Sequence, residues 1–149
     1  LQANPVGVLA CVDTEGNPHA STIYFSTDEN LNISFTTKHD TFKYKNISNH
    51  NAVMLVVFDA AEQAAIQISG QAREITDQTA ALNIYRDTLV AAKQTGEDVV
   101  PPIAKLAAGR YAAFTVTPDY VKLSEYGWGD NFAHAMEHAD DPNTGGDPA

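Results

Sequence analysis

The sequence predicts a mainly β protein of the α+β class, in which flanking helices accompany a closed or partly closed antiparallel barrel. Short segments rich in β-branched and aromatic residues alternate with turn signals through the first half of the chain. A segment with helical periodicity then interrupts this series, and two more extended segments follow it. The order is about five strands, a helical insertion and two strands, which fits such a barrel.

The first three extended segments predict an antiparallel meander. Val6 to Val12 is apolar and ends at the turn sequence DTEGNP. Residues 19–27 resume as a strand, and DEN forms the next turn. In residues 31–37, Leu31, Ile33 and Phe35 alternate with polar residues, so we expect one buried face.

The pattern changes after this third strand. Asp40 or Thr41 is expected to cap a short helix that ends between Asn49 and Asn51. Residues 52–59 and 64–75 then read as two further strands. Gly70 lies inside the second of these and predicts a bulge or bend.

A longer helix is expected from Asp77, its cap, to Lys93, with an apolar stripe at helical spacing. A short helix over residues 103–109 and two strands, separated at Pro118–Asp119, follow it. We expect one domain over residues 1–128 and an acidic tail over residues 129–149. The opening residues, LQAN, look like the end of a helix, which suggests that further chain precedes them.

Composition limits the possible partners. The chain has 149 residues and a formal net charge of −10, which disfavours nonspecific binding to nucleic acid or anionic membranes. No apolar run is long enough to cross a bilayer. The single cysteine, Cys11, lies among apolar residues, predicts a buried side chain and fits a reducing cytoplasm.

The basic residues are unevenly distributed. None occurs in residues 1–37, and then Lys38, Lys43 and Lys45 follow within eight positions. Between Thr36 and Lys43 the chain supplies hydroxyl groups, the start of a helix and ammonium groups, which are the groups that bind a terminal phosphate. An ordinary strand–loop–helix junction with solvated lysines explains this stretch about equally well.

Other familiar sites are absent from the sequence. It contains no phosphate loop ending in Lys-Ser or Lys-Thr, no dinucleotide fingerprint and no nucleophile elbow. His134 and His138 have the spacing of two ligands on one helix, but two histidines do not complete a metal site. We therefore predict no metal and no catalytic side-chain constellation.

Most of the chain resembles the FMN-binding split-barrel family related to pyridoxamine 5′-phosphate oxidases. The resemblance depends on the order and spacing of five stretches: GVLACVDTEGNPHASTIYF, ISFTTKHDTFKYKNI, VMLVVFD, IQISGQAREI and TPDYVKLSEY. It implies a six-stranded antiparallel split β-barrel and a homodimer with an FMN in each of two clefts at the interface.

The resemblance also implies roles for individual residues. Family members place the backbone of the second strand against the flavin ring, which corresponds here to Ser21, Thr22, Ile23 and Tyr24. The phosphate would contact Thr36 and Thr37 and then Thr41 and Lys43. Gln67 is the match for a ring-contacting glutamine, and Trp128 for an aromatic residue of the other subunit.

This chain departs from the family members that oxidise pyridoxamine phosphate. Ser21 and Phe42 stand where those members carry arginines, and their C-terminal Arg-His motif has no counterpart. Lost guanidinium groups mean lost bidentate phosphate contacts, so we do not expect that reaction. The leading expectation is an FMN-dependent oxidoreductase acting on a small molecule. The alternatives are a flavin-storage module, an empty cleft, a deazaflavin protein, or a haem protein ligated by His134 or His138.

Overall fold

The computed structural model describes residues 1–96, 98, 100 and 110–126. The strands are β1 (Val6–Val12), β2 (Pro18–Tyr24), β3 (Ser26–Thr27), β4 (Ile33–Lys38), β5 (Ala52–Asp59), β6 (Ala64–Glu74) and β7 (Tyr111–Glu125). The helices are α1 (Phe42–Asn49) and α2 (Gln78–Gln94). Six of the strands are long and β3 has two residues, so the predicted six-stranded mainly β fold is confirmed with one short addition.

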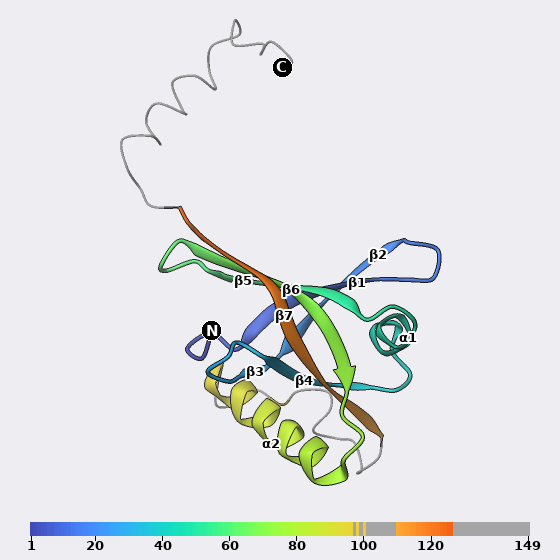
Figure 1. Ribbon diagram of the computed structural model, residues 1–149. Coiled ribbons are helices and arrows are strands. Elements are labelled where there is room, and N and C mark those ends of the chain that lie inside the picture. The colour runs from blue at the N-terminus through green and yellow to red at the C-terminus, as the bar shows by residue number, and fades with distance from the viewer. Residues whose placement is uncertain (97, 99, 101–109, 127–149) are drawn as a thin grey trace, which may run out of the picture.

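The strands form one antiparallel sheet in the order β2-β1-β5-β6-β7-β4-β3. β2 and β3 lie at opposite ends of this order, yet Phe25 alone separates them in sequence. The sheet must therefore curl until its two ends meet, as Figure 1 shows. The result is a split barrel whose open edge lies beside β2.

Alternating side chains fill the interior of this barrel. Phe25, Ile33 and Phe35 are fully buried, and the Phe35 ring stacks on that of Phe114 with centroids 5.6 Å apart. Burial of such side chains is worth about 1.5–3 kcal/mol each and is the main force that closes the sheet. Cys11 is buried as predicted and forms no disulfide.

Both described helices begin where the sequence indicates. Thr41, one of the two candidate caps, accepts a hydrogen bond from the Tyr44 N–H at 3.1 Å. Asp77 accepts one from the Ala80 N–H at 2.7 Å. α1 lies at one end of the barrel, and α2 packs against the outer face of β4 and β7 (Figure 1).

The strand break predicted at Pro118–Asp119 is wrong. β7 runs without interruption for 15 residues, and it absorbs Asp119 as the extra residue of a β-bulge opposite Ser69 and Gly70. The bulge accommodates Pro118, which cannot donate to a regular ladder. The bulge predicted at Gly70 is therefore confirmed, and it turns the far half of β7 away from α2 (Figure 1). The expected helix at 103–109 and the tail at 129–149 lie outside the described residues.

Candidate functional site

The two threonines at the end of β4 point to opposite faces of the sheet, because successive side chains of a strand alternate. Thr37 pairs with Ala112 and faces the barrel interior and α1. Thr36 pairs with Ala113 and faces α2, where its buried hydroxyl has no hydrogen-bond partner among the described residues. Their side chains therefore cannot contact one phosphate together, and one of the two would contribute through its backbone.

Hydrogen bonds within the protein occupy the Thr41 hydroxyl. It donates to the Lys38 carbonyl at 2.9 Å and accepts from the Tyr44 N–H. Since its one proton is used, the 3.1 Å contact with Thr37 requires the Thr37 hydroxyl to donate. Thr41 thus positions the loop and the helix start and has no proton left for a ligand in this arrangement.

The start of α1 still offers two backbone donors. The first four N–H groups of a helix have no partner inside it. Two of them are satisfied here, since the Tyr44 N–H donates to the Thr41 side chain and the Thr41 N–H donates to the Lys38 carbonyl at 3.3 Å. The N–H groups of Phe42 and Lys43 remain, at the positive end of the helix dipole.

Lys43 lies half-buried between α1 and β1. Burial lowers the pKa of its ammonium group, and the neighbouring Cys11 acts in the opposite direction. Among the described residues, the one ion pair within 4 Å joins His19 and Asp13 at 3.5 Å, so Lys43 has no carboxylate partner. An uncompensated, partly desolvated cation beside free amides is the electrostatic pattern of an anion site.

The same corner meets the open edge of the barrel. The Phe42 ring stacks on His19 of β2 with centroids 5.9 Å apart, so the start of α1 faces the start of β2. Residues Ser21 to Tyr24 continue along that strand, which pairs with β1 on one side. Half of the backbone groups of an edge strand point outward and are free to bind a flat ligand. Ile23 itself is 4% exposed and packs in the core.

Two of the predicted ligand residues are not brought to this corner. Gln67 lies on β6 and shares a row on the outer face with Thr22, three strands away. That separation is about 14 Å at the usual spacing between strands. Trp128 lies outside the described residues.

Three cavities of the described structure lie elsewhere. Their volumes are about 580, 360 and 310 Å³, and none is lined by Thr37, Thr41 or Lys43. The first and third lie beside β7, and the third brings together His39 and Arg110, an arrangement that the sequence did not predict. Over the described ranges, no helix has the length and apolar character to cross a membrane, and no group of three metal-binding side chains gathers.

Comparison with solved structures reproduces this fold. A pyridoxamine 5′-phosphate oxidase-related, FMN-binding protein from Nostoc punctiforme aligns with a TM-score of 0.63 and 16% identity, over 84% of this chain and 76% of that one. An F420 reductase aligns with a TM-score of 0.64 and 23% identity, over 82% and 93%. A haem-binding protein from Mycobacterium smegmatis aligns with a TM-score of 0.62 and 19% identity, over 84% and 51%.

Fold and site together define this chain as a split β-barrel protein with a cationic helix start at its open edge. The sequence profile of the family described as pyridoxamine 5′-phosphate oxidase matches residues 1–124, so the chain belongs to that family. A comparison of the sequence with curated proteins finds no match.

Proposed function

We propose that the protein is an FMN-dependent oxidoreductase that binds the flavin along the open edge of the barrel. The supporting observation is Lys43, a partly buried cation with no carboxylate partner beside the two free amides of α1. A phosphate dianion placed there would neutralise Lys43 and bind both amides. The family and the FMN-binding relative support the choice of ligand.

Each part of the edge would then have its own role. Lys43 and the amides of Phe42 and Lys43 would hold the phosphate, and the capped Thr41 would keep them in place. The outward backbone groups of Ser21 to Tyr24 would bind the ring. The flavin would supply the redox chemistry, while these residues orient it and exclude water.

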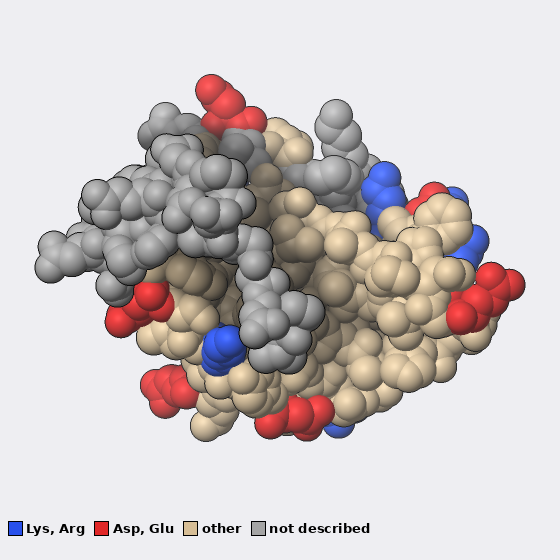
Figure 2. Space-filling view, turned by 90° about the horizontal axis from the view of Figure 1, so that it is seen from above, with Lys and Arg blue, Asp and Glu red and all other residues tan. Residues whose placement is uncertain are grey.

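We also propose that the protein is a homodimer formed through the outer face of the sheet. An apolar face crosses β1, β5 and β7, with Val8 44%, Met54 38%, Phe58 52% and Tyr120 53% exposed. Figure 2 shows a wide uncharged area, with acidic and basic residues around it, on the upper side of the molecule. Contiguous exposed apolar surface of this kind marks an interaction site. Gln67 lies on this same face, so pairing through it would give Gln67 a place near the second subunit.

The cofactor alternatives follow from the related structures. The F420 reductase supports a deazaflavin and the Mycobacterium smegmatis protein supports haem. We favour FMN because the described corner offers an anion site. The haem alternative depends on His134 or His138, which lie outside the described residues. We further propose a cytoplasmic location and a small-molecule substrate, and we do not propose pyridoxamine phosphate oxidation.

A spectrum and a titration of the full chain test this proposal. The purified protein should show flavin absorption, or should bind added FMN with quenching of its fluorescence. Photoreduction followed by oxygen or a quinone then separates an oxidoreductase, which reoxidises rapidly with turnover, from a storage module. A Soret band would show that the bound cofactor is haem and not FMN. A colourless protein that leaves FMN fluorescence unchanged would refute the flavin assignment.

A further inference from the structure

We infer that the cavity between α2 and the outer face of β4 and β7 binds a small organic anion with an apolar, aromatic body. The cavity has a volume of about 580 Å³. Pockets for small molecules usually measure roughly 300–1,000 Å³ and combine apolar walls with a few polar groups. Both features are present here, and the site is separate from the proposed flavin site.

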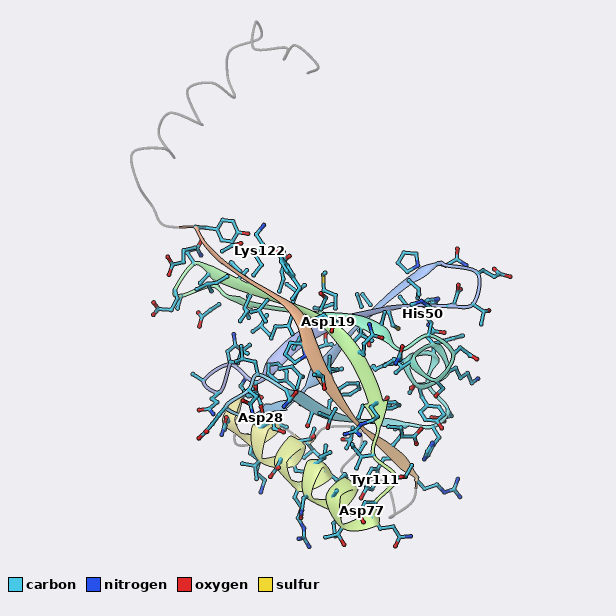
Figure 3. The ribbon with its side chains drawn as sticks, in the orientation of Figure 1. Asp28, His50, Asp77, Tyr111, Asp119 and Lys122 are labelled. Carbon is cyan, nitrogen blue, oxygen red and sulfur yellow. The ribbon has the colours of Figure 1, made fainter. Side chains whose placement is uncertain are left out.

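The walls of the cavity are apolar and aromatic. Ala113 of β7 lies on the floor, and its small side chain leaves the space open. Ala112 also borders the cavity, but its side chain points into the barrel core. Leu82 of α2 lines the opposite wall. The ring of Tyr111 stacks on that of Tyr85 with centroids 4.5 Å apart, which gives the cavity a fixed aromatic side. Figure 3 shows Tyr111 and Asp77 at the end of the molecule where α2 begins.

The mouth of the cavity is cationic. His39 lines it and also lines an adjoining cavity of about 310 Å³, together with Lys38, Asp40 and Arg110. Lys38 pairs with Tyr111 across the sheet, which places Lys38 next to Arg110 in space although 72 positions separate them in sequence. Neither cation has an ion-pair partner within the described residues. Lys38 and Arg110 outnumber the one carboxylate at this opening, that of Asp40, so the opening carries net positive charge and favours an anionic head group.

Besides Asp40 at the mouth, a second acidic residue lines the cavity at its other end. Glu74 pairs with Phe114, four positions along β7 from Arg110. At the usual rise per residue this separates Glu74 from the mouth by roughly 13 Å. The side chain of Glu74 is exposed and solvated. The cavity thus has distinct ends, and the anionic head belongs near Lys38 and Arg110.

Thr36 has a buried hydroxyl on the same face of β4, but Thr36 is not among the residues that line the cavity. Thr36 pairs with Ala113, so both side chains face α2. The neighbouring Ser34 on the same face is satisfied by Thr115 at 3.0 Å, whereas Thr36 is 7% exposed and has no partner among the described residues. Buried polar groups without partners are rare and require an explanation.

The loop between β4 and α1 separates this cavity from the proposed flavin site. Phe42 and Lys43 face β2 and β1, where they meet His19 and Cys11. Lys38 instead pairs with β7 on the opposite side of the same loop. His39 is held between the two by an edge-on contact with Tyr44 at 4.7 Å. Ligands at the two sites would therefore not compete.

Two dyes that differ by a charged group test the inference. The probe is 8-anilinonaphthalene-1-sulfonate, and the matched control is uncharged N-phenyl-1-naphthylamine, which has the same aromatic body. Both are titrated into the full chain with and without FMN, and ¹H–¹⁵N spectra locate the bound dye. We expect one sulfonate dye per chain, shifts at Ala113 and Leu82, and no displacement by FMN.

Variants then separate the mouth from the walls. Lys38→Ala/Arg110→Ala should weaken binding of the sulfonate dye about tenfold and leave the neutral dye unchanged. Lys122→Ala/Lys93→Ala removes two cations far from the cavity and should change neither; Figure 3 shows Lys122 at the opposite end of β7 from Tyr111. Leu82→Trp fills the cavity and should weaken both dyes. The inference would be overturned by any of four results: displacement of the dye by FMN, shifts confined to Val8 and Met54, equal effects of the two double variants, or no dye binding.

Discussion

Gly70→Ala tests the bulge that lets β7 continue past Pro118. A Cβ atom at residue 70 would lie 2.0 Å from the Thr117 carbonyl oxygen and 2.9 Å from its carbonyl carbon. Both neighbours are backbone atoms, so no flexible side chain can turn aside. The two strands must separate by more than an ångström at the point where β6 meets the bulge.

The expected cost follows from that separation. Overpacking of this kind costs about 1–3 kcal/mol, and two weakened ladder hydrogen bonds add about 1 kcal/mol each. We therefore expect a loss of roughly 3–5 kcal/mol in the free energy of unfolding, and a melting temperature lower by roughly 6–20 °C for a domain of this size.

Gly16→Ala is the matched control. A Cβ atom at Gly16 meets nothing within 4 Å, although its φ of +86° makes any side chain unfavourable. That change should cost about 1 kcal/mol. Urea unfolding followed by far-UV circular dichroism measures both variants. Equal midpoints for the two would show that the bulge yields without resistance and would refute the steric argument.

Four further expectations follow from the described contacts. Lys43→Ala should weaken FMN binding by about 1.5–3 kcal/mol in a fluorescence titration. The same titration of the wild type should show affinity falling as pH rises through the lowered Lys43 pKa. Unchanged affinity of the variant would show that Lys43 does not bind the phosphate. Thr41→Ala should lower the free energy of unfolding by about 1 kcal/mol through the lost cap, and an unaltered urea midpoint would contradict this. Met54→Asp should shift the mass by light scattering from two chains of 16.0 kDa to one, and a wild-type monomer would refute the dimer. Hydrogen bonds from Asn17 lower the pKa of Asp13 to about 2. The ionised Asp13 carboxylate should therefore stabilise the fold fully above its unfolded pKa of 3.8, and this stabilisation should disappear as pH falls toward 2. An Asp13 pKa near 4, measured by NMR titration of the carboxyl group, would contradict this.

Local sequence signals were sufficient for most of the fold. The alternation of Ile33 and Phe35 identified β4, and both side chains are fully buried. Asp77 was identified as a cap and Thr41 as one of two candidates, because such side chains bind amides only three residues away. Such features depend on neighbours in sequence, and the chain itself contains that information.

Features that depend on strand pairing were missed. Pro118 and Asp119 look like a turn, and only the partner strand with Gly70 turns them into a bulge. The cationic mouth forms because the register of β4 and β7 places Lys38 beside Tyr111. The opposite directions of the Thr36 and Thr37 side chains, by contrast, could have been predicted from the sequence. Side chains alternate along a strand, so the expectation that both would contact one phosphate was inconsistent with the predicted strand.

The split in the barrel explains why the candidate site is so sparse in one chain. A continuous barrel would pair the outer edge of β2 with another strand, whereas here that edge remains free between the start of α1 and the apolar outer face. A flat ligand bound there would have the protein on one side only and would keep the other side in water. The exposed Val8 and Met54 on the same sheet supply a surface on which a second chain can complete the enclosure. Loss of the dimer should therefore weaken flavin binding even when Lys43 and Thr41 are intact. A monomeric Met54→Asp variant that binds FMN with full affinity would show that the flavin site does not depend on the dimer.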